Sequence, residues 1–272
     1  MDKISVIIPT CNRPELLMRA VRSIQSQTYR NVEIIIVNDG DDKLYKEDFN
    51  KMGNIPLFVY QNDKKKGGSG ARNSGVLKST GTYIAFLDDD DEWLPNTVET
   101  LLKTIKSTKA ILCYGGKNII HEQGKTIKAY SYNRPKLLSS KYAILVNNFI
   151  GSTSSVMVRK DCFESSVWFD ESLTVLQDYD LFIRICNTGP VVGINTLVVN
   201  YYINYSHLHI SVGIKGFWKA GSTIIRKNRF RKYSWLLTIG LLKIYCIKII
   251  KSNGILRPLF SLPFKLVRYI RQ

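Results

Sequence analysis

Short apolar runs alternate with amphipathic stretches over the first 110 residues of the chain. The apolar runs are bounded by turn residues, as buried strands of a parallel sheet are. They lie at residues 4–9, 33–37, 57–60 and 82–87. Apolar residues at helical spacing after Pro14 predict a helix with Asn12 as its cap, and further helices are predicted at 71–77 and after Pro95. Strands alternating with helices predict an α/β fold with a mostly parallel central sheet flanked by helices.

Beyond residue 110 the pattern is less regular. Apolar runs at 110–114, 153–159 and 197–203 each predict a strand. The polar stretch 115–134 favours a hairpin, and 178–187 favour a short helix.

Polar residues stand where three of the predicted strands end. Pro9, Thr10 and Cys11 close the first strand, Asp39 follows the second, and Asp88 opens a run of aspartates after the fourth. In open parallel sheets, ligands bind beyond the carboxyl ends of the strands. These groups are therefore expected around one crevice.

The four consecutive aspartates 88–91 repel one another when ionised, and like charges at this spacing raise one another's pKa values unless a cation compensates. Mg²⁺ and Mn²⁺ prefer carboxylate oxygens and readily bridge to substrate phosphates. A divalent metal shared with a diphosphate therefore explains the cluster. The alternative is a solvent-exposed acidic turn that caps the next helix.

Asp39 ends a strand in the sequence NDG. It could accept a hydrogen bond from the N3–H of a uracil-type base, or form an Asx turn into Gly40, and spacing alone favours neither. The segment NDKKKGGSGARN combines a basic loop with a helix start, which together with Arg72 suits a diphosphate. A solvated basic loop is the alternative for Lys64 to Lys66.

Asp178 and Asp180 lie in LQDYDLFIRI. A carboxylate near a metal and an apolar wall can have its pKa tuned to remove a proton from an acceptor hydroxyl, and Asp178 is the candidate for that role. Both acids could instead be favoured by the dipole at a helix N-terminus. We expect Asp180 to be structural.

Composition and charge narrow the class of protein. Hydrophobic residues make up 44% of the chain, and five widely spaced cysteines include no CxxC pair, so a disulfide framework or zinc finger is not indicated. The N-terminus lacks the pattern of a secretory signal, which favours the cytoplasm.

The net charge of +17 is concentrated after Asp180, the last acidic residue. Residues 181–272 hold fifteen Lys and Arg, and residues 1–180 hold the remaining 24 against 22 acids. The cations of 224–272 are interleaved with Trp, Leu, Ile and Tyr, as in interfacial helices on anionic lipid. The apolar stretch 234–247 is interrupted by Lys243 and is shorter than the ~20 residues of a spanning helix. We therefore expect the protein to lie peripherally on the inner face of the plasma membrane. The alternative is that the C-terminal segment is a solvated basic tail. No nucleic-acid partner is expected, because the aspartate cluster would repel phosphate unless it held a metal, and no DNA or RNA motif is present.

Three segments in this order resemble the family 2 glycosyltransferases: SVIIPTCNRPELLMRAVRSIQSQTYRNVEIIIVNDG, GSGARNSGVLKSTGTYIAFLDDDDEWLP and LQDYDLFIRI. Members of this family have the Rossmann-like GT-A fold and invert the anomeric centre of the sugar. The resemblance covers about residues 1–190. It implies that Asp178 is the catalytic base, that Asp90 binds Mn²⁺ or Mg²⁺, and that His209 is a second possible metal ligand. It also implies a nucleotide-binding set: Pro9, Thr10, Cys11, Arg13, Asp39, Arg72, Asp88 and Asp89.

Three positions depart from the family pattern. Cys11 replaces a Tyr that stacks on the base, Asn38 replaces the first Asp of a DDG motif, and Gln177 replaces the Glu before the catalytic base. The essential carboxylates are all present.

The resemblance implies transfer of a sugar from a nucleotide-sugar, with a UDP-sugar favoured, to a hydroxyl of a glycan or lipid-linked acceptor in cell-surface polysaccharide biosynthesis. It divides the chain into a GT-A domain at 1–210, with a nucleotide-binding half at 1–110 and an acceptor-binding half at 111–210. A basic amphipathic membrane-associating helical segment follows at 211–272. The alternatives are a catalytically inactive sugar-nucleotide-binding scaffold and a nucleotidyltransferase on a related α/β fold.

Overall fold

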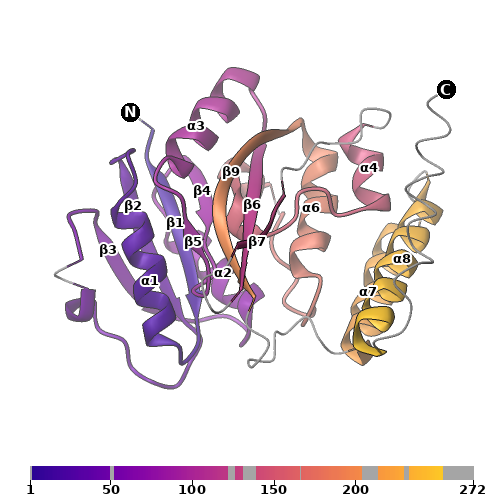
Figure 1. The fold of residues 1–272 in the computed structure, drawn as a ribbon, viewed down its shortest axis with the longest axis horizontal. Coiled ribbons are helices and arrows are strands. Elements are labelled where there is room, and N and C mark those ends of the chain that lie inside the picture. Colours follow the sequence, from indigo (N-terminus) through magenta and orange to yellow (C-terminus); the bar gives the residue numbers. More distant parts are fainter. Residues whose placement is uncertain are drawn as a thin grey trace.

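The computed structural model describes residues 2–49, 52–121, 126–130, 139–165, 167–203, 214–229 and 233–253. The described strands form one nine-stranded sheet in the order β3-β2-β1-β4-β8-β6-β9-β5, and β7 pairs with β6. Helices lie on both sides of the sheet (Figure 1).

The first half of the sheet is parallel. It contains β3 (Leu57–Gln61), β2 (Val32–Asn38), β1 (Ile4–Thr10) and β4 (Tyr83–Phe86). Every residue of β1 and β2 is buried, as expected for strands covered on both faces. The prediction of parallel strands is confirmed for this half.

The second half of the sheet is mixed. Its strands are β5 (Glu92–Trp93), β6 (Leu112–His121), β7 (Thr126–Tyr130), β8 (Val156–Arg159) and β9 (Val191–Ile203). β8 runs antiparallel to β4 and β6, whereas β6 and β9 are parallel, and β7 and β5 are antiparallel to β6 and β9 respectively. The sheet as a whole is therefore mixed rather than mostly parallel, although the α/β class with flanking helices is confirmed.

Two predicted strands differ from the observed ones at their first residues. The strand predicted at 153–159 begins only at Val156, because Thr153–Ser155 form a 3₁₀ turn, η2, in which the Ser152 hydroxyl accepts the backbone N–H of Ser154. The strand predicted at 197–203 begins earlier, at Val191. The hairpin predicted within 115–134 is formed by β6 and β7.

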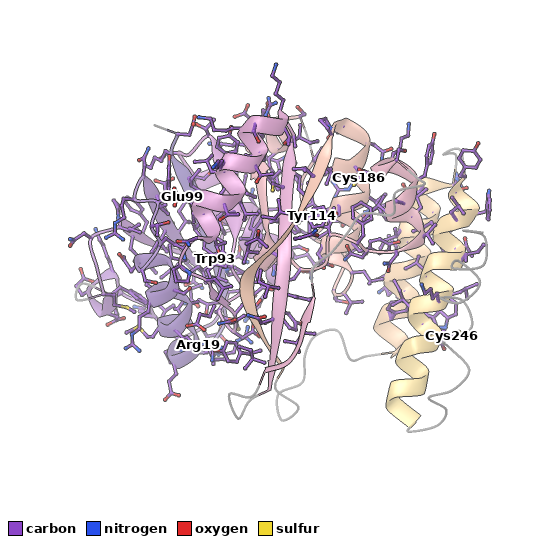
Figure 2. All side chains as sticks on the ribbon, turned by 45° about the horizontal axis from the view of Figure 1, so that its top comes forward. Arg19, Trp93, Glu99, Tyr114, Cys186 and Cys246 are labelled. Atoms are coloured by element: carbon purple, nitrogen blue, oxygen red, sulfur yellow. The ribbon has the colours of Figure 1, made fainter. Side chains whose placement is uncertain are left out.

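Each face of the sheet carries its own hydrophobic core. α1 (Pro14–Gln25) and α3 (Thr97–Thr108) contribute to one core, and α2 (Gly68–Lys78), α4 (Ser140–Val146) and α6 (Gln177–Thr188) contribute to the other. Two shorter helical segments, η1 (Lys46–Phe49) and α5 (Asp161–Glu164), complete these layers. Figure 2 shows Trp93 and Tyr114 among the packed side chains, and both are buried.

Asn12 does not cap α1. The N-cap is Arg13, which makes no side-chain capping bond, and Asn12 adopts a left-handed backbone with φ 52°. A Cβ added to Gly40 would lie 2.0 Å from Asn12 Oδ1, so the Asn12 side chain packs against the turn after β2. The predicted cap is wrong because this contact holds the side chain away from the helix.

Two C-terminal helices, α7 (Ile214–Asn228) and α8 (Ser234–Asn253), lie side by side at one end of the molecule next to α4 (Figure 1). Phe217 of α7 and Leu237 and Leu241 of α8 are buried in the same core as α6. A Cβ on Gly240 would lie 2.5 Å from the Leu145 carbonyl oxygen, so α8 crosses the end of α4 closely.

The outer side of α8 is also apolar, with Trp235, Ile239 and Leu242 exposed. Among the described residues, no helix combines the length and the apolar character needed to cross a bilayer. The division of the chain into a domain at 1–210 and a membrane-associating segment at 211–272 stays a prediction.

Candidate active site

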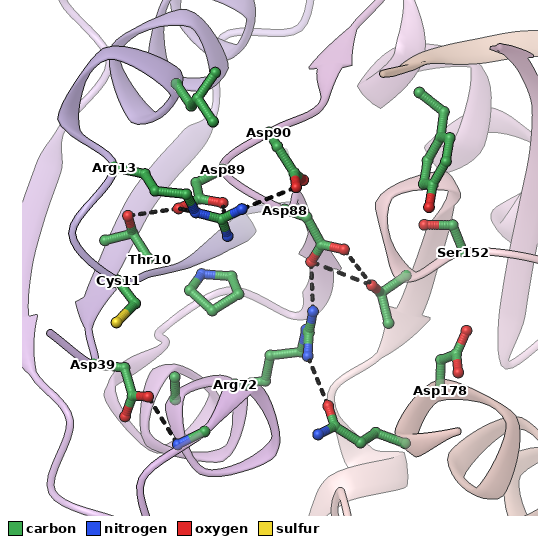
Figure 3. A pocket seen from close by; sticks show the side chains of 18 of the residues that line it. Thr10, Cys11, Arg13, Asp39, Arg72, Asp88, Asp89, Asp90, Ser152 and Asp178 are labelled. Carbon is green, nitrogen blue, oxygen red and sulfur yellow. Dashed lines mark hydrogen bonds and ion pairs between the residues drawn. The ribbon is translucent and has the colours of Figure 1, made fainter. Parts of the chain in front are cut away.

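One cavity of about 800 Å³ opens where β1, β2 and β4 end. It is lined by all of the predicted site residues that the structure describes: Pro9, Thr10, Cys11, Arg13, Asp39, Arg72, Asp88, Asp89, Asp90 and Asp178. In Figure 3, Asp39 and Cys11 lie on one side of the view and Asp178 and Ser152 on the other, and Asp88, Asp89 and Asp90 lie in the upper middle between them. His209 lies outside the described residues.

Asp89 organises the wall next to β1. Its side chain is fully buried and accepts a hydrogen bond from the Thr10 hydroxyl at 2.7 Å. The Arg13 guanidinium lies 2.5 Å from Asp89 and 3.0 Å from Asp90. Burial raises the pKa of Asp89 to about 6, against the opposing effect of Arg13. Asp89 therefore fixes Thr10 and Arg13 in the cavity wall.

Asp88 is held between two elements. Arg72 on α2 lies 2.5 Å from the Asp88 carboxylate, and the Asp88 N–H donates to the Ser154 hydroxyl at 3.1 Å. The other end of the Arg72 guanidinium donates to Gln177 Oε1 at 3.4 Å. Gln177 therefore links Arg72 to the helix that carries Asp178.

The aspartate cluster fits a divalent metal. Asp88, Asp90 and Asp91 can each offer one carboxylate oxygen, and these oxygens lie within 4.8 Å of one another. Asp91 is buried, and neither of its oxygens accepts a well-formed hydrogen bond, although the nearby Ser154 hydroxyl partly favours its charged form. Burial and the charges of Asp90 and Asp88 raise its pKa well above the ordinary value. A hard cation with oxygen ligands would relieve this repulsion.

Asp39 holds the loop before α2. Its carboxylate accepts the Gly67 N–H at 2.8 Å and the Asn62 side-chain amide at 2.5 Å. Its neighbour Asn38 accepts the Gly40 N–H and donates to the Asp42 carbonyl, so the Asn at this position serves the turn itself. Asp39 faces the cavity from a fixed position and can receive a donor from a base.

Asp178 lies in the first turn of α6. Burial raises its pKa above the ordinary value, while the Tyr179 N–H and Arg72 partly oppose the shift. A carboxylate with a raised pKa in a cavity wall suits a general base. Asp180, two residues later, is instead buried in ion pairs with Arg184 at 2.8 Å and Lys227 at 3.2 Å.

The structure adds residues that the sequence patterns do not indicate. Lys117 of β6 and Tyr201 and Tyr202 of β9 line the cavity, and so do Arg19 and Ser152. The Arg19 guanidinium lies 3.8 Å from the centre of the Tyr202 ring, and the Lys117 ammonium lies 4.4 Å from that of Tyr201. The polar residues Lys117 and Asn118 in the predicted hairpin are the signal that could have pointed to Lys117.

The chain is similar to known proteins in both sequence and fold. The model of the glycosyl transferase family 2 matches residues 5–166. The putative colanic acid biosynthesis glycosyl transferase WcaA of Escherichia coli K12 is 30% identical over 79% of this chain and 77% of its own length. The GalNAc(5)-diNAcBac-PP-undecaprenol beta-1,3-glucosyltransferase of Campylobacter jejuni is 34% identical over 63% of this chain and 56% of its own length.

A similar fold occurs in TarS of S. aureus, solved in complex with UDP-GlcNAc, with a TM-score of 0.69 and 16% identity over 93% of this chain and 74% of that one. The chain spans 28% and 32% of the length of two uncharacterised Rickettsia glycosyltransferases that it also matches. Because the family model covers more than half of the residues and WcaA matches over most of both lengths, this chain belongs to glycosyl transferase family 2.

Proposed function

We propose that the chain transfers a sugar from a UDP-sugar, with inversion at C1, to a hydroxyl of a glycan or lipid-linked acceptor. The observation that carries the proposal is that Asp178 lines the same cavity as Asp88, Asp90 and Arg72, and lies to one side of them in Figure 3. A base and a leaving-group site on opposite sides of a reacting carbon are what an in-line displacement needs. The family assignment and the UDP-GlcNAc complex of TarS support the choice of donor.

The base and the diphosphate of the donor each have partners in the cavity. Asp39 would accept the N3–H of uracil, and Arg72 would pair with the diphosphate through its charged, forked donors. Arg72 lies on α2, whose N-terminus opens at Gly68 beside the same cavity. Mn²⁺ or Mg²⁺, held by Asp90 with Asp88 and Asp91, would supply positive charge to the departing diphosphate.

Asp178 would take the proton of the acceptor hydroxyl as its oxygen forms the new bond to C1. The bond between C1 and the diphosphate oxygen breaks, and its electron pair leaves with UDP. One displacement inverts C1, so no second carboxylate is required as a nucleophile.

Binding of UDP tests the donor assignment. Calorimetry should show UDP binding in the presence of Mn²⁺, and addition of EDTA should weaken it sharply, because Asp88, Asp90 and Asp91 would then repel the diphosphate. GDP, which presents a purine to Asp39, serves as the comparison. Equal UDP affinity with and without metal would refute the metal-dependent donor site.

The acceptor and the location are inferred from relatives and from charge. Two relatives are named for colanic acid biosynthesis and for a PP-undecaprenol substrate, which favours polysaccharide assembly on a lipid carrier. We therefore infer that the protein works in the cytoplasm, on the inner face of the plasma membrane. Its C-terminal helices and the residue before α8 supply a suitable surface, with exposed aromatic and aliphatic side chains: Trp218, Tyr233, Trp235, Ile239 and Leu242. Lys219 and Arg226 are exposed on the same helix pair.

Liposome sedimentation tests this surface. The full chain should bind anionic vesicles more strongly than neutral ones, and high salt should weaken binding without abolishing it, because each cation contributes about 1 kcal/mol while apolar insertion is not screened. Replacing Trp235 and Ile239 together with Ser should lower binding roughly 10-fold or more. Leu77→Ser, at another exposed apolar position, is the matched control. Unchanged binding of the double variant would exclude this face as the anchor.

A further inference from the structure

Lys117 lies at an irregular point of the sheet. It belongs to β6, where it pairs with Val199 of β9 and Tyr130 of β7. The register between β6 and β9 shifts at Gly116 and again before Lys117. Such bulges commonly redirect a side chain next to a functional site, and Lys117 lines the cavity.

The Lys117 ammonium has a ring contact but no hydrogen-bonded partner among the described residues. Its Nζ lies 4.4 Å from the centre of the Tyr201 ring, and no carboxylate of those residues lies within 4.0 Å. Burial lowers the pKa of Lys117, and the carboxylates of Asp91 and Asp178 oppose that shift from farther away. The three N–H donors of Lys117 are therefore held in the cavity wall, where they can donate hydrogen bonds to oxygen atoms of a ligand.

The other cations that line the cavity each have an oxygen partner, and for Arg19 this is the Asp90 carbonyl oxygen, to which it donates a hydrogen bond. Arg72 contacts Asp88 at 2.5 Å, and Arg13 contacts Asp89 at 2.5 Å, so each is already paired with a carboxylate. A lysine that served only to neutralise the acidic wall would make a similar contact. The absence of one within the described part of the chain leaves Lys117 available to a ligand.

The position of Lys117 indicates which part of a ligand it would meet. Asp91 belongs to the cluster proposed for the metal and diphosphate, and Asp178 is the proposed base; both act electrostatically on Lys117. In the proposed reaction the transferred sugar lies between those two groups. The remaining parts of the donor, the base and the diphosphate, are accounted for by Asp39 and Arg72.

We propose that Lys117, supported by the Tyr201 ring, binds hydroxyl oxygens of the sugar that is transferred and so helps to select the donor. This inference rests on the proposed function, because it presumes a UDP-sugar in the cavity. Lys117 is a specificity residue in this assignment, and it takes no part in the transfer of the proton.

Calorimetry with UDP, UDP-glucose, UDP-galactose and UDP-GlcNAc, each with Mn²⁺, tests the assignment. In Lys117→Met, the affinity for UDP should stay within about twofold of the wild type. The affinity for the preferred UDP-sugar, relative to UDP, should fall roughly 10-fold or more, since hydrogen bonds from a charged donor are lost. Met is similar in shape and removes a partly buried charge, so we expect the variant to fold. Lys103→Met, at an exposed position of α3, is the control.

Tyr201 provides a second pair of variants. Tyr201→Phe keeps the ring beside the ammonium and should preserve the relative affinity, whereas Tyr201→Leu should lower it in the direction of Lys117→Met. Unchanged ratios of UDP-sugar to UDP affinity in Lys117→Met would overturn the inference, and so would an equal loss for UDP itself. Failure of the wild type to bind UDP would instead refute the proposed donor, and with it the premise of this assignment.

Discussion

Asp178→Asn should lower turnover by roughly 100-fold or more, the usual scale for loss of a general base. The amide keeps the shape of the side chain and its place in the first turn of α6, but it cannot accept the proton of the acceptor hydroxyl. UDP affinity should change little, because the proposed nucleotide contacts come from other elements. Transfer assays with a fixed donor, together with calorimetry, measure the two quantities separately.

The pH dependence gives this prediction a second readout. A base must be ionised, so kcat/KM should rise with pH through the pKa of Asp178, which burial places above the ordinary value for an aspartate. That acidic limb should disappear from the residual activity of Asp178→Asn. Near-normal turnover in the variant would show that the base is another residue.

Asp180→Asn is the matched control on the same helix. Asp180 is 1% exposed and paired with Arg184 and Lys227, so its replacement should lower the unfolding temperature. We expect its pH profile to keep the acidic limb. A loss of that limb in Asp180→Asn alone would transfer the role of base to Asp180.

Asp90→Asn should lower turnover by about 10²–10³-fold or more, the scale for removing one electrostatic contact to a charge that develops in the transition state. The substitution removes one of the three carboxylates that fit a metal while leaving the side-chain volume nearly unchanged. Higher Mn²⁺ concentrations should be required for whatever activity remains. Activity titrated against Mn²⁺ measures both effects.

Asp41→Asn is the control for this substitution. Its side chain is 89% exposed and pairs with Lys66 on the loop near the cavity, so loss of its charge should leave the Mn²⁺ requirement unchanged. If Asp90→Asn kept full activity at the same Mn²⁺ concentration, the metal site would not include Asp90.

The parts of the molecule that the sequence predicted well are those where one local pattern determines the outcome. Continuous apolar runs identified β1 and β2 because both faces of these strands are covered. The strand-end position of Asp39 and Asp88 brought them to one cavity because parallel strands end at the same edge of a sheet.

The missed features depend on contacts between distant segments. Lys117 and Tyr201 meet only because β6 and β9, far apart in sequence, pair in parallel with an irregular register. The spacing to Pro14 predicts Asn12 as a helix cap, but its side chain packs against Gly40. Neither contact produces a periodic pattern of apolar and polar residues in the neighbouring sequence.

The ion pairs of Lys227 affect how shortened forms of the protein can be interpreted. This α7 residue contacts Asp170 and Asp180, and the second of these lies on the helix that carries Asp178. Phe217 of the same helix is buried in the core that α6 shares. A polypeptide ending before α7 would therefore lose part of the support of the helix that carries Asp178, together with any membrane anchor. Deletion mapping would confound the two roles, and an inactive truncated form would carry no information about lipid attachment.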